Sequence, residues 1–240
     1  MVSVKELYVR YGSDMPWALN GFNLEAPVKS RTALIGANGA GKSTLFLALT
    51  GIIDKSEGIV IIDNITLEKR ALAQIRQKTG LIFQNPDDQL FMPTVQEDVA
   101  FGPRNLRLAE DSVEGLVNDS LARLDITRLK NRFTHRLSGG EKRLVALAGV
   151  LAMSPTVMLM DEPSSFLDPG ARRNLINILN QLDQTIIIAT HDLDFALLTC
   201  NTVVLLKEGR VFTEGKAREV LLNEKTLKKC GLELPLSAKI

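Results

Sequence analysis

The sequence predicts an α/β fold in which a helical segment is inserted between two halves of a buried sheet. Short apolar runs typical of buried strands occur before this segment, at residues 32–35, and after it, at residues 157–160 and 185–189. The middle third of the chain has helical periodicity and few strand candidates. We therefore predict one domain with a core, a helical subdomain and a C-terminal tail, at residues 1–84 with 154–215, 85–153 and 216–240 respectively.

The other elements are expected from periodicity and turn residues. Further strand candidates are residues 2–11, 22–26, 58–62 and 79–83, with a hairpin of 203–206 and 210–213. Helix candidates are residues 45–49, 71–78, 94–100, 112–124, 141–153 and 171–182. Gly102 and Pro103 predict a break after the third of these helices.

Composition is ordinary for a globular protein, with 45% hydrophobic and 24% charged residues in 240. The formal net charge of +1 gives no sign of a nucleic-acid partner. Cys200 and Cys230 lack CxxC spacing and indicate thiols of a reducing compartment. The N-terminus has no signal-peptide pattern, and no apolar run is as long as a membrane span, so we expect a cytosolic chain.

Residues 36–43 read Gly-Ala-Asn-Gly-Ala-Gly-Lys-Ser and lie between an apolar run and a helix candidate. Strand, glycine-rich loop and helix form the context that a phosphate-binding P-loop requires. The glycines let backbone N–H groups approach an anion, and the positive end of the following helix faces the same point. Lys42 can reach the β- and γ-phosphates, and the Ser43 hydroxyl can bind Mg²⁺. The loop therefore predicts that this protein binds a nucleoside triphosphate.

Two carboxylates follow the apolar run at residues 157–160. Asp161 is expected at the carboxyl end of a buried strand, where a doubly wound sheet presents its ligand site, so it can hold Mg²⁺ alongside Ser43. Glu162 points differently and can polarise the attacking water as a general base. The alternative is an ordinary acidic helix start after a strand.

Ser138, Gly139 and Gly140 precede the strongest predicted helix and form a second anion cradle. Taken alone, Ser138 is more simply an N-cap. One chain needs only one phosphate cradle per nucleotide, so the two cradles make sense together if each completes a site on a neighbouring chain.

These features together resemble the ATP-binding cassette (ABC) ATPases, over residues 4–215. The resemblance implies a P-loop NTPase (RecA-like) core, an antiparallel β subdomain, an inserted helical subdomain, and hydrolysis of ATP with Mg²⁺. Residues 36–43 resemble the Walker A loop, 157–161 the Walker B strand, 137–141 the family signature and 165–168 the D-loop. The implied catalytic residues are Glu162, the switch histidine His191, and Lys42.

The resemblance also implies which residues contact the nucleotide and its metal. Gln84 matches the glutamine that senses Mg²⁺, and Tyr11 matches the aromatic residue that stacks on adenine; a tyrosine merely packed on the first strand is the alternative. The implied nucleotide-binding residues are Tyr11, Gly36, Ala37, Asn38, Gly39, Ala40, Gly41, Lys42, Ser43, Thr44, Gln84, Ser138, Gly139, Gly140, Glu141 and Asp168. The implied Mg²⁺ ligands are Ser43, Gln84 and Asp161.

Two departures from the family pattern stand out. The signature ends in Glu141 where glutamine is commonest, which adds a negative charge near a triphosphate and predicts slightly slower hydrolysis. Ser164-Ser165-Phe166 replaces the usual threonine-led start of the D-loop. Neither change removes a group that the chemistry needs, so we expect an active ATPase.

Three functions compete for such a cassette: the motor subunit of a membrane transporter, a soluble ABC ATPase of DNA repair, translation or iron–sulfur assembly, and a P-loop scaffold without turnover. About 50 residues separate Gln84 from the signature, too few for the coiled coil of a repair ATPase. Translation factors usually carry two cassettes. The presence of Glu162 and His191 argues against a scaffold without turnover. The length of the chain does not exclude an iron–sulfur assembly ATPase.

The run at residues 85–103 favours transport. It mixes acidic groups with Leu90, Phe91 and Met92, as in a surface that grips a partner helix; a loop with three packed apolar residues is the alternative. The run resembles that of energy-coupling factor (ECF) type ATPases, which drive uptake of cobalt, nickel or vitamins. This implies an acidic, apolar groove for a helix of a transmembrane coupling protein. The short C-terminal tail favours the cobalt/nickel branch over the vitamin branch.

The implied partners are a second ABC ATPase subunit, with a homodimer favoured, and integral membrane coupling and substrate-binding proteins. Two cassettes would sandwich two Mg·ATP, each between residues 36–43 of one chain and 138–141 of the other. The implied location is the cytoplasmic face of a prokaryotic cell membrane, as a peripheral protein, with no nucleic acid bound.

Overall fold

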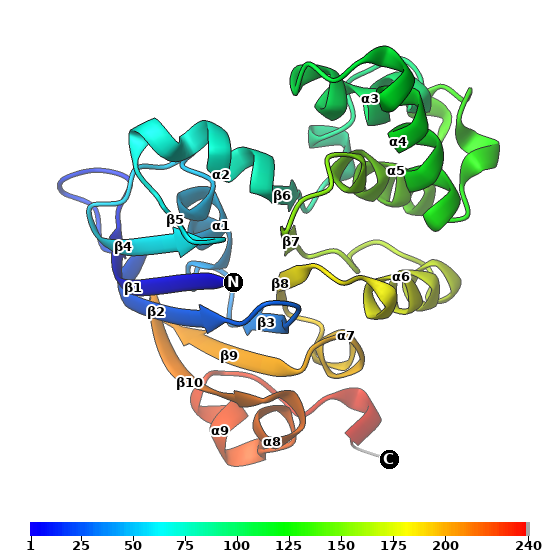
Figure 1. Ribbon diagram of the computed structural model, residues 1–240. Coiled ribbons are helices and arrows are strands. Elements are labelled where there is room, and N and C mark those ends of the chain that lie inside the picture. The colour runs from blue at the N-terminus through cyan, green and yellow to red at the C-terminus, as the bar shows by residue number, and fades with distance from the viewer. Residues whose placement is uncertain (239–240) are drawn as a thin grey trace.

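A six-stranded, mainly parallel sheet forms the centre of the protein in the computed structural model, which describes residues 1–238 (Figure 1). Its strands are β3 (Arg31–Ile35), β6 (Thr79–Ile82), β7 (Val157–Asp161), β8 (Thr185–Thr190), β9 (Thr202–Lys207) and β10 (Arg210–Lys216). They lie in the order β10-β9-β3-β8-β7-β6, and only the β9–β10 hairpin is antiparallel. The carboxyl ends of β3, β7 and β8 therefore meet at one edge of the sheet.

An antiparallel sheet lies beside this core. Its strands, in spatial order, are β2 (Leu19–Ala26), β1 (Val2–Val9), β4 (Glu57–Ile62) and β5 (Ile65–Thr66). Alternation puts Val4 and Leu24 opposite each other on the buried face, where they share one apolar cluster with Leu45 and Leu49 of α1 (Lys42–Leu49). The same cluster includes Leu159 of β7, so α1 is packed between the two sheets.

Three helices form the inserted subdomain: α3 (Val95–Asn105), α4 (Glu110–Arg123) and α5 (Gly139–Ala152). Two of them start with capping boxes, in which Thr94 pairs with Glu97 and Ser138 with Glu141. The subdomain stands apart from the antiparallel sheet in Figure 1. Its apolar faces nevertheless join the core cluster that contains Met158 and Ile186 of the parallel sheet.

The predicted break at Gly102–Pro103 is wrong, because α3 continues to Asn105. Pro103 lies in the last turn, where its missing N–H costs the helix a single backbone bond. Gly102 allows close packing on α5: a Cβ there would lie 2.6 Å from Cγ of Met153. Burial of this face against α5 outweighs the local breaker signal.

The remaining helices are α2 (Leu72–Lys78), α6 (Pro169–Gln181), α7 (Leu193–Thr199), α8 (Ala217–Leu221) and α9 (Glu224–Lys229). The sequence analysis did not predict α7, which has only seven residues. The strand predicted at 22–26 begins earlier, at Leu19, and the helix predicted from Glu141 begins at Gly139 because Ser138 caps it. Among residues 1–238, no helix combines the length and apolarity needed to cross a bilayer.

Candidate nucleotide-binding and hydrolysis site

The P-loop joins the end of β3 to the start of α1. Gly39 and Gly41 have φ of 79° and 103°, in the region that favours glycine. Gly36 is needed for a different reason, since a Cβ there would lie 2.7 Å from the carbonyl oxygen of Leu206. The loop therefore wraps tightly around the space in front of the N-terminus of α1, which suits an anion.

Lys42 is held by its own loop. Its Nζ donates to the carbonyl oxygens of Gly36 at 2.6 Å and Ala37 at 3.1 Å. Burial lowers the pKa of Lys42, while the carboxylates of Glu162 and Asp161 oppose that shift. The side chain is thus oriented across the loop mouth, where an ammonium can meet phosphate oxygens.

Ser43 and Asp161, which the sequence analysis predicts as Mg²⁺ ligands, lie next to each other. The Ser43 hydroxyl donates to Oδ2 of Asp161 at 2.6 Å, although the two residues are far apart in the chain. Burial is the largest cause of a raised pKa at Asp161; the hydrogen bond from Ser43 opposes it. A hydroxyl and a carboxylate fit Mg²⁺, which prefers oxygen and is commonly completed by water and phosphate. Within residues 1–238, no cluster of three or more His, Cys, Asp or Glu side chains offers an all-protein metal cage.

Glu162 is buried, with 6% of its surface exposed, and is fixed by the end of the neighbouring strand. Its Oε2 accepts from the Thr190 hydroxyl at 3.0 Å, and its Oε1 lies 2.8 Å from Nδ1 of His191. Its φ of 44° lies in the left-handed region, which residues other than glycine rarely adopt. The two consecutive carboxylates are therefore held by different partners and can have different roles.

These groups share one cavity of about 280 Å³. It is lined by Asn38, Gly39, Ala40, Gly41, Lys42, Ser43, Thr44, Gln84, Asp161, Glu162 and His191. Tyr11 does not line it but bonds through Oη to Oγ1 of Thr44 at 3.0 Å, with 60% of its surface exposed. A tyrosine ring in that position offers an exposed face beside the phosphate-binding loop.

The signature residues lie elsewhere. Ser138 caps α5, accepting from the N–H of Glu141 at 3.3 Å, while its own N–H donates to Oε2 of Glu141 at 3.0 Å. Asp168 caps α6, accepting from the N–H groups of Gly170 and Ala171. Neither Ser138 nor Asp168 lines the P-loop cavity. One chain therefore brings together the P-loop, both carboxylates, Gln84 and His191, but not the signature or Asp168.

The extra negative charge of Glu141 is paired within the chain. Oε1 of Glu141 is 3.1 Å from the Arg128 guanidinium and 3.8 Å from that of Arg132. The backbone N–H of Ser138 is the largest cause of a lowered pKa at Glu141, with Arg128 contributing in the same direction. The unusual glutamate thus has its own local countercharges.

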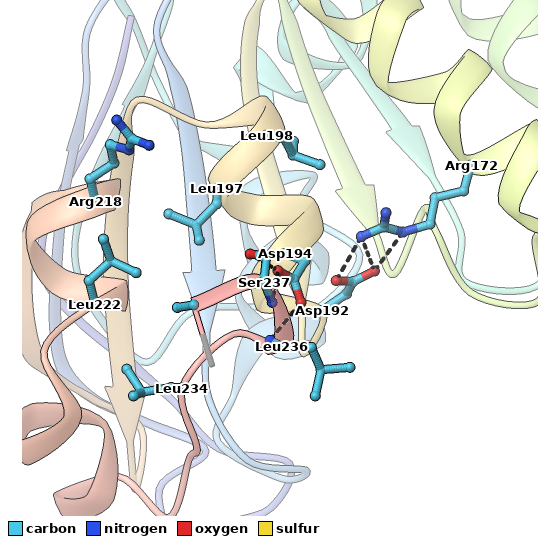
Figure 2. A pocket seen from close by; sticks show the side chains of 11 residues that line it. Arg172, Asp192, Asp194, Leu197, Leu198, Arg218, Leu222, Leu234, Leu236 and Ser237 are labelled. Atoms are coloured by element: carbon cyan, nitrogen blue, oxygen red, sulfur yellow. Dashed lines mark hydrogen bonds and ion pairs between the residues drawn. The ribbon is translucent and has the colours of Figure 1, made fainter. Parts of the chain in front are cut away.

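Several positioning residues escaped the sequence analysis. Thr190 holds Glu162, as described above, and Arg172 of α6 forms a two-pronged ion pair with Asp192, the residue after His191 (Figure 2). Asp194 of α7 accepts from the N–H groups of Leu236 and Ser237 in the C-terminal tail (Figure 2). Of these residues, only Asp192 could have been found from the sequence, because it is a helix-capping residue type directly before an apolar helix. A cavity of about 1050 Å³, larger than the one at the P-loop, lies in this region.

The fold, the P-loop and the carboxylate pair define an ATP-hydrolysing cassette, and comparison with known proteins agrees. A family model described as ABC transporter matches residues 19–165, more than half of the chain. The energy-coupling factor transporter ATP-binding protein EcfA of Methanothermobacter thermautotrophicus is 44% identical over 245 aligned positions, which cover 100% of this chain and 78% of EcfA. The chain therefore belongs to the ABC transporter family, as a transporter ATPase that hydrolyses ATP.

Solved structures give the same result for the fold. The structure of cbiO1 from Clostridium perfringens, described as part of the ABC transporter complex cbiONQ, has a TM-score of 0.86 and 40% identity, with 99% of this chain and 97% of cbiO1 covered. The cassette MJ0796, solved as a dimer bound to ADP and Pi, has a TM-score of 0.80 and 28% identity, covering 91% of this chain and 99% of MJ0796. The predicted core, antiparallel β subdomain and helical subdomain are confirmed.

Proposed function

We propose that this chain is the motor subunit of an ECF-type importer, with cobalt or nickel as the transported substrate. The observation that carries the transport role is a groove of about 470 Å³ between α2 of the core and the helical subdomain, which borders the segment after Gln84. Its lining includes Leu81, Gln89, Phe91, Phe101 and Met153. The likeness to EcfA and to cbiO1 supports the ECF assignment.

Hydrogen bonds and a ring contact hold the residues that line the groove in place. Phe91 is 61% exposed and packs edge-on against Phe101, with ring centroids 4.6 Å apart. Buried Asp98 holds the loop that carries Phe91, because its Oδ2 accepts from the N–H groups of Phe91 at 2.9 Å and Met92 at 2.8 Å. Gln89 fixes the other side, bonding to Phe83 and to Ala146 of α5. An apolar slot with a fixed polar rim suits one amphipathic helix of a membrane partner.

Capture of that partner tests the transport role. The tagged chain is used as bait in detergent-solubilised membranes, and bound proteins are identified by mass. We expect an integral membrane protein, with recovery reduced at least about tenfold by Phe91→Ala, since exposed aromatic anchors dominate such contacts. The matched control is Phe212→Ala, an exposed phenylalanine of β10 that does not line the groove. Recovery of soluble partners alone would replace the transport role with one in iron–sulfur assembly or DNA repair.

The same proposal assigns roles within a dimer. Two copies sandwich two ATP molecules, each between residues 36–43 of one chain and Ser138–Glu141 of the other. The N-terminus of α5 supports this, because it carries the partial positive charge of the helix dipole and does not line the P-loop cavity of its own chain. Tyr11 stacks on adenine, and Asp168 shapes the contact between chains.

Hydrolysis then follows from how the side chains are held. Glu162, fixed by Thr190 and His191, takes the proton of the attacking water. Lys42 and His191 stabilise charge on the transferred phosphoryl group, and Ser43, Asp161 and Gln84 would hold Mg²⁺. The metal, when bound, neutralises charge on the β- and γ-phosphates. Loss of the γ-phosphate removes the anion that holds the two chains together.

Uptake measurements test the substrate. Membrane proteins recovered with this chain are reconstituted with it in vesicles, and entry of cobalt, nickel or labelled vitamins is followed on addition of ATP. We expect ATP-dependent entry of cobalt or nickel. In the cell, this chain would lie at the cytoplasmic face of a prokaryotic membrane. Entry of a vitamin alone would assign the other ECF branch.

A further inference from the structure

Arg143 is a buried cation that the hydrolysis mechanism does not use. It lies in α5, two residues beyond Glu141, and only 2% of its surface is exposed. Its Nη1 donates to the carbonyl oxygen of Phe83 at 2.6 Å, and its Nη2 donates to that of Gln84. Its Nε has no hydrogen-bond partner within the described residues.

A guanidinium in this position is costly, because burial removes its water and carbonyl oxygens carry only partial charge. Burial lowers the pKa of Arg143, and only the charge of Asp161 opposes that shift. An apolar side chain would fill the same volume with a smaller desolvation free energy. The retained contacts are with the backbone at Phe83 and Gln84, where the chain leaves β6 and enters the helical subdomain.

A second contact strengthens the same connection. The neighbouring Lys142 donates to Oδ1 of Asp87 at 2.6 Å. The first turns of α5 therefore hold the segment 83–87 at three points, two on its backbone and one on a side chain. Gln84 lines the P-loop cavity, whereas Ser138 caps the same helix that carries Arg143.

We propose that Arg143 is a positioning residue that makes the signature helix follow Gln84, so that nucleotide in the P-loop orients Ser138 toward a partner chain. The proposal rests on the sandwich of the previous section. A displacement of Gln84 moves the two carbonyl oxygens, and α5 moves with them because a forked guanidinium holds both. Arg143 contacts neither nucleotide nor metal in this scheme.

The test separates nucleotide binding from dimerisation. In a Glu162→Gln background, binding of a fluorescent ADP analogue is measured at low protein concentration, and dimer formation is measured by light scattering against ATP concentration. We expect Arg143→Gln to leave the ADP Kd within about twofold but to raise the ATP concentration for half-dimerisation about tenfold, with Arg143→Lys in between. The control is Arg31→Gln, which also loses a bond to a backbone carbonyl, that of Thr199, at the end of β3 remote from the P-loop.

Hydrogen–deuterium exchange gives a readout that does not require a dimer. With a slowly hydrolysed ATP analogue and Mg²⁺, we expect changed exchange at both 36–45 and 138–145 in the parent chain, but only at 36–45 in Arg143→Gln. Equal exchange changes in the parent and in Arg143→Gln would overturn the proposal. A parallel loss of ADP binding and dimerisation in Arg143→Gln would also overturn it, because that result marks a purely structural role. If the Glu162→Gln parent itself stays monomeric with ATP bound, the sandwich fails, and the exchange result still decides on Arg143.

Discussion

Oε1 of Glu162 lies 2.8 Å from Nδ1 of His191, so the two residues assigned to proton transfer and charge stabilisation are in direct contact. The contact joins the end of β7 to the residue after β8. His191 has most of its side chain exposed, whereas that of Glu162 is buried. The histidine thus connects the buried carboxylate that we propose as the base with the open side of the cavity, where the γ-phosphate of ATP is expected.

Replacing the buried base should stop turnover without preventing binding. Glu162→Gln keeps the shape and can still accept from Thr190, but it cannot take a proton from water. We expect kcat to fall about 10²–10⁴-fold with ATP affinity retained. Steady-state hydrolysis and equilibrium ATP binding check this. Turnover near that of the parent would remove Glu162 from its role.

Thr190 should affect turnover mainly through Glu162, although its hydroxyl also accepts from the N–H of Asp192 at 3.1 Å. Thr190→Val keeps the volume and removes the hydroxyl that donates to Oε2 at 3.0 Å. A hydrogen bond to a charged group is worth about 1.5–3 kcal/mol, so we expect kcat to fall roughly tenfold or more while KM stays within about twofold. In the Glu162→Gln background the same change should have little further effect on the residual rate. Equal losses in both backgrounds would mean that Thr190 acts independently.

Charge pairing at the signature should be visible in the KM for ATP. Removing Arg128 and Arg132 together leaves Glu141 without its countercharges, so we expect KM to rise about 3–10-fold at low salt and less at high salt. Adding Glu141→Gln to that variant should recover part of the loss, because a neutral side chain no longer repels the triphosphate. If KM is unaffected by all three changes, the pairing has no role in binding ATP.

Asp98 should give a pH-dependent stability. Burial is the largest cause of its raised pKa, above the ordinary 3.8. Between 3.8 and the raised value the folded chain binds more protons than the unfolded chain, so this contribution to stability falls as pH rises through that window. Asp98→Asn can accept the same N–H groups and does not titrate. We therefore expect the unfolding free energy of the parent minus that of Asp98→Asn to fall as pH rises from about 4 toward neutral and then to level off. A difference that is flat or rises with pH contradicts the assignment.

The sequence located the parts of the site that depend on local pattern. The P-loop glycines and Lys42 follow from one contiguous stretch, and Asp161 follows from the end of an apolar strand. The structure brings these groups to one cavity with Gln84 and His191. Their roles toward ATP remain predictions.

Residues whose roles depend on distant contacts were not predictable in this way. Thr190 meets Glu162 only because β7 and β8 are neighbours, and Arg143 meets Phe83 only because α5 packs against the end of β6. From sequence, Arg143 is one more charge on a helix. The break expected at Gly102 and Pro103 failed for a related reason, since packing on α5 stabilises a helix that its local residues disfavour.

The sandwich of ATP between two chains is tested most directly by the molar mass of the Glu162→Gln chain with and without ATP. We predict a monomer alone, a dimer with Mg·ATP, and a monomer again when Ser138→Arg is added, with ATP still bound by the P-loop. A matched variant, Ser237→Arg in the C-terminal tail, should dimerise like the parent. A chain that binds ATP but stays monomeric, or a Ser138→Arg variant that dimerises equally well, would contradict a site completed by the signature of a second chain.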